Sequence, residues 1–261
     1  MDYLCPDPSG GVSAWLTDIN KEKARNFEDP RDRVILRYYD SVIRASDLLL
    51  LEDRNWINDT LISFWFQYLQ QGAYGEHPNL LFIDPAVTQL VKLGDTEDLP
   101  YILNTLDVKH KEYIFLPVNN NDSVVAPGGS HWSLLIYKKS CNKWYHFDSQ
   151  QGFNSRHAHC LVTRFIPYLN GLTPPTIIDT ACTQQDNGYD CGAFVMLYAQ
   201  IAANKAVNNL PLDTCYIKSL EANKIRQVIL KLIRNASKDN TGTVGAVNLW
   251  LHAPQVTAFI T

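Results

Sequence analysis

One cysteine of this chain has the position that a catalytic nucleophile needs. Cys191 stands between Asp190 and Gly192 in QDNGYDCG, immediately before the apolar run AFVMLYAQIAA. A cysteine that only fills core space is typical of the inside of such a run, whereas this one stands at its edge. The run predicts a buried helix with Asp190 as its cap, and the first-turn N–H groups and dipole of a helix favour a thiolate. Gly192 would let another segment approach closely.

A histidine and an aspartate lie at the two ends of a predicted β-hairpin. In HWSLLIYKKSCNKWYHFDS, two apolar strands flank the polar turn candidate KKSCNK. His131 opens the first strand, Asp148 closes the second, and the midpoint between them falls in the turn. We therefore expect them at paired positions on one face, where the carboxylate can hold the imidazole. A structural ion pair at a sheet edge would look the same.

Together, Cys191, His131 and Asp148 supply a nucleophile, a base and a group that orients the base. A loop glutamine could add a donor to a developing oxyanion, and both Gln185 and Gln184 are candidates. The cluster HAHC (157–160) does not favour zinc, because its side chains span more than one helix face and no CxxC accompanies them. We expect no metal and no cofactor.

The bulk composition fits one globular domain. The chain has 261 residues, 46% of them hydrophobic, and a net charge of -4, which argues against nucleic acid or an anionic membrane as the main partner. Its six cysteines are scattered without a CxxC pair, and neither a signal segment nor about 18 uninterrupted apolar residues occur. These features predict a reduced, soluble, intracellular protein.

Apolar periodicity and capping residues predict the elements that position these groups. Asn58 or Asp59 can begin a helix that Gly72 ends, and Asp84-Pro85 opens a second helix. Further helices are expected over 156–170, 191–203 and 219–235, and strands over 112–119, 131–138 and 143–148.

The predicted fold class is α+β, with a central, mostly antiparallel sheet flanked by helices and the nucleophile at a helix N-terminus. Residues 1–33 are expected to be a poorly ordered arm. Residues 34–236 would form the catalytic domain and residues 237–261 a C-terminal tail.

The motifs resemble those of a known family. HWSLLIY, then FDS, then a glutamine six residues before the cysteine of YDCG, are similar to the sentrin/SUMO-specific proteases, the ubiquitin-like protein proteases with a papain-like fold. WINDTLISFWFQYL resembles the WLND helix of that family. FIDPAVTQLVK and GGSHWSLLIY resemble most closely its deneddylating member. The resemblance covers roughly residues 34–236.

The resemblance implies roles for individual residues. Cys191 would be the nucleophile, His131 the general base, Asp148 its orienter and Gln185 the oxyanion donor. Trp56 and Trp132 would roof a narrow tunnel for a Gly-Gly tail, and Asp59 would grip the modifier. Ile57 stands where the family usually has leucine and Gly188 where it commonly has serine. These departures leave substrate choice more open than chemistry.

The implied activity is hydrolysis after the C-terminal Gly-Gly of the Nedd ubiquitin-like modifier, in precursor processing and in deneddylation of cullins or other proteins. The enzyme would act as a monomer in the cytoplasm or nucleus, with no nucleic acid or membrane as partner. The alternatives are a SUMO- or ubiquitin-specific protease of the same fold and an inactive module that only binds a modifier.

Overall fold

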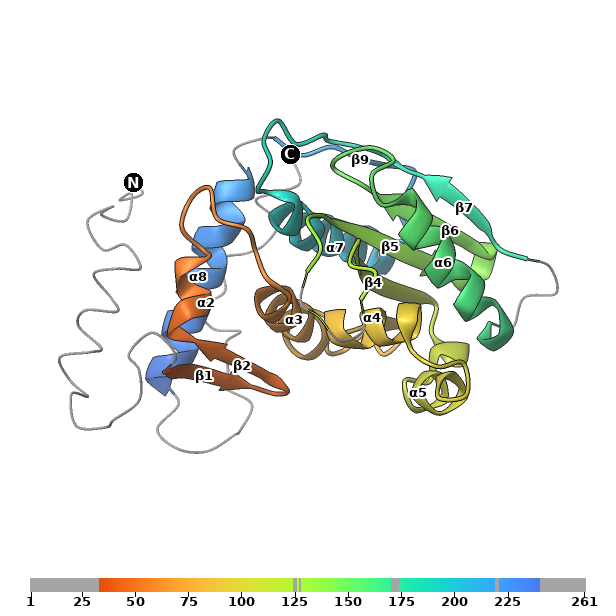
Figure 1. Ribbon diagram of the computed structural model, residues 1–261, viewed down its shortest axis with the longest axis horizontal. Coiled ribbons are helices and arrows are strands. Elements are labelled where there is room, and N and C mark those ends of the chain that lie inside the picture. Colours follow the sequence, from red (N-terminus) through yellow and green to blue (C-terminus); the bar gives the residue numbers. More distant parts are fainter. Residues whose placement is uncertain (1–32, 124–125, 127, 170–173, 219–220, 240–261) are drawn as a thin grey trace.

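The computed structural model describes residues 33–239 apart from 124–125, 127, 170–173 and 219–220 (Figure 1). The helices are α2 (Ala45–Leu49), α3 (Asp59–Gln67), α4 (Pro85–Leu93), α5 (Leu99–Thr105), α6 (Ser155–Phe165), α7 (Cys191–Val207) and α8 (Glu221–Asp239). Short 3₁₀ or π turns are η1 (Tyr68–Ala73), η2 (Val108–His110), η3 (Lys139–Cys141) and η4 (Ile166–Tyr168).

The strands form one five-stranded sheet and two small ladders. They are β1 (Val34–Tyr38), β2 (Ser41–Arg44), β3 (Leu80–Phe82), β4 (Tyr113–Asn119), β5 (Trp132–Lys138), β6 (Lys143–Phe147), β7 (Thr176–Asp179), β8 (Ala181–Cys182) and β9 (Thr214–Cys215). The main sheet has the order β3-β4-β5-β6-β7; β4, β5 and β6 pair antiparallel, while β3 and β7 join their neighbours in parallel. The α+β class is as expected, but the sheet is mixed.

The main sheet is buried between two helical layers, so its strands are apolar on both faces. Leu134 and Ile136 of β5 belong to the core shared with α3, α7 and α8. Leu135 and Tyr137, which alternate with them, belong to the core shared with α4, α5 and α6. In Figure 1, α6 and α7 lie on opposite faces of the sheet, and α8 lies beside the β1–β2 hairpin. This sandwich fixes the ends of β5, β6 and α7, where the candidate residues are.

The helix starts follow the capping residues. The side chain of Asn58 accepts a hydrogen bond from Leu61 N and caps α3. Asp84 caps α4 by accepting from Ala86 N, with Pro85 in the first turn. Of the two predicted caps of α3, Asn58 and Asp59, the structure therefore shows Asn58 to be the cap, and Asp59 is the first helical residue.

The β5–β6 hairpin has a register different from the predicted one. Leu134 pairs with Phe147, and Lys138 pairs with Lys143. If His131 paired directly with Asp148, the partner of each β5 residue would lie two residues earlier in the chain. The turn closes through η3 and Asn142, which has a φ of 52°. Because side chains alternate with period two, a shift of two residues keeps both side chains on the predicted face.

The predicted terminal segments fall largely outside the described residues. Only Arg33 of the arm 1–33 is described, and of the tail 237–261 only the first three residues, which continue α8 to Asp239. In the described part of the chain, no helix combines the length and apolarity needed to cross a membrane.

Candidate active site

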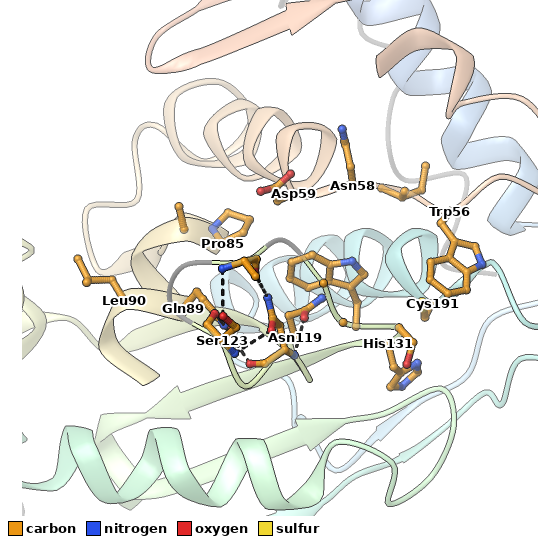
Figure 2. Close-up of a pocket in the computed structure, with 18 residues that line it drawn as sticks. Trp56, Asn58, Asp59, Pro85, Gln89, Leu90, Asn119, Ser123, His131 and Cys191 are labelled. Carbon is orange, nitrogen blue, oxygen red and sulfur yellow. Dashed lines mark hydrogen bonds between the residues drawn. The ribbon is translucent and has the colours of Figure 1, made fainter. Parts of the chain in front are cut away.

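A cavity of about 610 Å³ opens beside Cys191 and His131. One wall comes from the segment 56–59 and the start of α4, and the other from the segment that joins β4 to β5. In Figure 2, Trp56, His131 and Cys191 lie at one end of this groove, and Gln89 and Leu90 lie at the other. The groove therefore runs from α4 to the thiol.

Cys191 is the first residue of α7 and is only 5% exposed, so the groove is its route to solvent. The residue before it behaves differently from the prediction. Asp190 holds the N-cap position, but its side chain makes no capping hydrogen bond. Its carboxylate binds Arg226 at 2.8 Å and Asn187 Nδ2 at 2.9 Å instead. A buried arginine competes successfully for the carboxylate because an unpaired buried charge is costly.

His131 and Asp148 meet as the hairpin predicted. His131 Nε2 lies 2.6 Å from Asp148 Oδ1, and both side chains are buried. The carboxylate also accepts from Gln150 N at 3.0 Å and Asn154 N at 2.9 Å. Although burial opposes its ionisation, the hydrogen bond from His131 and those backbone donors hold the pKa of Asp148 below its usual value. The carboxylate is thus fixed and charged against the ring.

The other ring nitrogen is left for the thiol. His131 Nδ1 is buried and has no hydrogen-bond partner of ordinary geometry among the described residues. Burial opposes a charged ring, but the hydrogen bond with Asp148 and the electrostatic interaction with the nearby Cys191 outweigh it and raise the pKa of His131 to about 9. Catalytic hydrogen bonds are often long in the absence of substrate, so both observations fit an imidazolium that faces Cys191.

This pKa predicts the alkaline limb of the pH profile. His131 should keep its proton up to about pH 9, so kcat/KM for a modifier amide should fall as the pH rises through about 9 and the acid for the leaving amine is lost. The raised pKa also stabilises the fold below the ordinary histidine pKa of about 6.5, and this contribution disappears as the pH passes about 9. A rate profile that stays flat to pH 10 would contradict the assignment.

The two candidate glutamines have different surroundings. Gln185 Nε2 donates to Asn187 O at 2.7 Å, and its Oε1 accepts from Ser149 Oγ at 2.7 Å. Gln184 Nε2 donates to Asp148 O at 3.0 Å and Cys182 O at 3.2 Å. Neither residue lines the groove, so an oxyanion role for Gln185 stays a prediction.

The three predicted substrate-binding residues all line the groove. Trp56 is 53% exposed, although tryptophan is usually largely buried. Trp132 begins β5, is partly buried, and packs against the main core. Asp59 is exposed at the first turn of α3. Two aromatic side chains and one exposed carboxylate along a single groove suit a polypeptide ligand.

Gly192 is required where the Trp56 wall meets the nucleophile helix. A Cβ at this position would lie 2.7 Å from Ile57 Cβ and 3.2 Å from Ile57 Cγ2. We expect Gly192→Ala to lower the free energy of unfolding by about 1–3 kcal/mol, because the branched side chain cannot move away without its backbone. Urea denaturation measures this change.

Gly188 provides the matched control for that substitution. It lies in the loop that precedes α7, and a Cβ there would meet nothing within 4 Å. Gly188→Ala should therefore leave the stability within about 0.5 kcal/mol of the parent. An equal loss of stability in Gly192→Ala and Gly188→Ala would show that the contact with Ile57 does not exclude a side chain at position 192.

Asn154 is a supporting residue that the sequence did not reveal. It is fully buried, and its Nδ2 donates to Val118 O at 2.9 Å and Ser133 Oγ at 3.1 Å while its backbone N–H binds Asp148. It therefore ties the carboxylate to two strands. An asparagine before a predicted helix is expected to be a cap, so no sequence signal distinguished it.

Lys92 is a second buried residue that supports the site. Its ammonium is buried on α4 and donates to Asn119 O and, at 2.7 Å, to Asn121 O, at the start of the groove wall. A lysine within the apolar run PAVTQLVKL was the available signal, because a buried lysine needs partners.

In the HAHC cluster, His159 Nδ1 contacts Ser155 O. The described residues contain no group of three histidine, cysteine or acidic side chains able to hold a metal.

Comparison with known proteins gives consistent relatives. The family described as Ulp1 protease family, C-terminal catalytic domain, matches residues 55–238. Sentrin-specific protease 8 of Rattus norvegicus is 36% identical over 168 residues, covering 63% of this chain and 77% of the relative. NEDD8-specific protease 1 of Arabidopsis thaliana is 36% identical over 172 residues, covering 65% and 75%.

Solved structures match the fold. The C-terminal Ulp1 protease domain in complex with Smt3, the yeast ortholog of SUMO, aligns with a TM-score of 0.62 and 22% identity, over 85% of this chain and 95% of that one. The Chaetomium thermophilum Ulp1-like SUMO protease catalytic domain aligns with a TM-score of 0.58 and 16% identity, over 90% and 92%. At these identities the likeness concerns the fold.

Proposed function

Because the chain belongs to the Ulp1 protease family, we propose that it is a cysteine protease and isopeptidase that cleaves after the C-terminal Gly-Gly of the Nedd ubiquitin-like modifier. The observation that carries the chemistry is the buried His131–Asp148 pair at 2.6 Å, with Cys191 beside the free ring nitrogen. The relative named NEDD8-specific protease 1 supports the choice of modifier.

The reaction proceeds through a thioester. The Cys191 thiolate attacks the carbonyl carbon of the terminal glycine, and the C–N bond breaks as His131 gives its proton to the leaving amine. Water then adds to the thioester, His131 takes a proton from it, and the thiolate leaves as the modifier's carboxylic acid is released. Asp148 holds the ring through both steps, and Gln185 together with the Cys191 N–H would stabilise the oxyanion.

The side chains that border the groove explain why the proposed substrate ends in glycine. Trp56 and Trp132 border the groove beside Cys191, and side chains on the last two residues of a substrate would compete with these rings for space. Asp59 would contact the modifier further from the reaction centre. The proposed substrates are the modifier precursor and modifier conjugates, with cullins among them.

The remaining parts of the proposal concern the setting of the enzyme. We expect it to act as a monomer in the cytoplasm or nucleus, on protein conjugates rather than on nucleic acid or membranes. The net charge of -4 supports the part of this expectation that concerns nucleic acid, since nucleic-acid binding draws on a basic surface.

A covalent-adduct assay tests the proposal. The protein is mixed with the Nedd modifier, SUMO and ubiquitin, each carrying a thiol-reactive group in place of its terminal carboxylate, and the mass is measured. An adduct with the Nedd modifier alone, absent in Cys191→Ala, is the expected result. Adducts with SUMO or ubiquitin alone would keep the chemistry and reject the substrate, while no adduct with any of them would favour a binding module.

A further inference from the structure

A buried arginine outside the groove connects the two segments that form its catalytic end. Arg226 lies on α8, is 1% exposed, and does not line the groove. Long charged side chains are almost never fully buried unless every charge is paired. Its partners therefore indicate what the burial achieves.

The first set of partners lies in the tryptophan segment, residues 50–57. Arg226 Nη1 donates to Leu50 O at 2.8 Å and to Glu52 O at 3.3 Å, and Nη2 donates to Asn55 O at 2.8 Å. Three carbonyls of this segment thus accept hydrogen bonds from one guanidinium, and the segment curves around it. Trp56, the groove residue beside the thiol, follows Asn55 directly.

The second set lies in the cysteine segment, residues 187–191. Arg226 Nη2 donates to Asp190 Oδ1 at 2.8 Å and approaches Tyr189 O at 3.4 Å. The other oxygen of Asp190 is held by Asn187 Nδ2 at 2.9 Å. Cys191, the nucleophile of the proposed reaction, follows Asp190 directly.

The tryptophan segment also touches the residue that directly follows the cysteine segment, without the arginine. The Ile57 side chain lies against Gly192, where a Cβ would be 2.7 Å away. One planar guanidinium with donors in a fixed fork therefore spans two backbones that are in contact on the groove side. The contact limits how closely the segments approach, and the arginine limits how far they separate.

We propose that Arg226 is a positioning residue that sets the spacing between Trp56 and Cys191, and hence the width of the groove at the scissile bond. This inference rests on the proposed function. The arginine touches neither substrate nor reacting atoms, and acts through the two segments alone. A wider groove would hold the glycine tail less firmly over the thiolate.

The main test compares Arg226→Met with Arg226→Lys at a temperature where both are folded. With a fluorogenic modifier amide, kcat/KM should fall about tenfold or more in each, with KM raised, since a misplacement of about 1 Å can cost about 10²-fold. Alkylation of Cys191 by iodoacetamide should stay within about threefold of the parent, because His131 is untouched and the reagent is small. Lysine keeps the charge for Asp190, but its compact ammonium lacks the planar fork with which Nη1 reaches the Leu50 and Glu52 carbonyls while Nη2 reaches Asp190.

Lys231→Met is the charge-matched control for Arg226→Met, because Lys231 is exposed on the same helix and each of these two substitutions removes one positive charge. Its kcat/KM should equal that of the parent. If folded Arg226→Lys keeps kcat/KM within about twofold, or if its loss is matched by Lys231→Met, the proposal is overturned. A parallel loss of alkylation and turnover would also overturn it, because a general structural defect moves both.

A second measurement does not depend on the modifier. Hydrogen exchange at residues 50–57 and 187–191 should be faster in Arg226→Lys than in Lys231→Met, whatever substrate the enzyme takes. Equal exchange in the two variants rejects the positioning role. A parent without activity toward any modifier rejects the proposed function, and the exchange result then decides about Arg226 alone.

Discussion

Cys191→Ala is expected to abolish hydrolysis of the modifier amide while leaving the affinity for the modifier unchanged. Removal of the nucleophile of a serine protease lowers kcat on the order of 10⁶-fold, and a thiol that forms the acyl intermediate should be needed to a similar degree. The side chain is small, so its truncation leaves the groove walls in place. The measurements are turnover of a fluorogenic substrate and the dissociation constant of the cleaved modifier.

Cys141→Ala is the control for this prediction. Cys141 is an exposed free cysteine on η3, away from the groove. Its replacement should change neither turnover nor binding. Residual turnover above about 1% of the parent in Cys191→Ala would mean that another group forms the covalent intermediate or that none is formed.

Asp148→Asn should lower kcat by about 10⁴-fold, the size of the effect in serine-protease triads. An amide NH₂ would donate to His131 Nε2, which must then carry no proton, so the remaining proton would sit on Nδ1 beside the thiol. The ring loses the charge partner 2.6 Å away, and the pKa of His131 should fall from about 9. NMR titration of the histidine ring measures that fall independently of activity.

Asp179→Asn is the matched control for the aspartate. Asp179 contacts the buried ring of His146 at 3.2 Å but is itself mostly exposed and lies outside the groove. Its substitution removes the same charge and should leave kcat within about twofold of the parent. If the two asparagine variants titrate His131 at the same pH, Asp148 does not raise the pKa of the catalytic ring.

The local parts of the site followed from the sequence. Strand alternation and a polar turn predicted that His131 and Asp148 share a face, and they do, although the pairing register is shifted by two residues. The apolar run that follows Cys191 and Gly192 predicted a helix that starts at the cysteine, and α7 does start there. Such features depend on neighbours along the chain, whose periodicity and turn chemistry can be read directly.

Partners distant in sequence could not be assigned in this way. Asp190 was expected to cap α7, but Arg226, 36 residues further along, takes its carboxylate. The parallel edge strands β3 and β7 were missed, because their pairing with β4 and β6 depends on long connections rather than on turn residues.

The sequence by itself determined the class of fold, the identity of the candidate triad and the family, because residue types, spacing and periodicity carry that information. Only the tertiary structure decided which polar groups hold these residues in place. Asn154 and Arg226 contact backbone carbonyls, and every residue has a carbonyl, so no residue type in the sequence marks the partner. Burial then enforces these contacts, since a buried charge or amide left unpaired is costly.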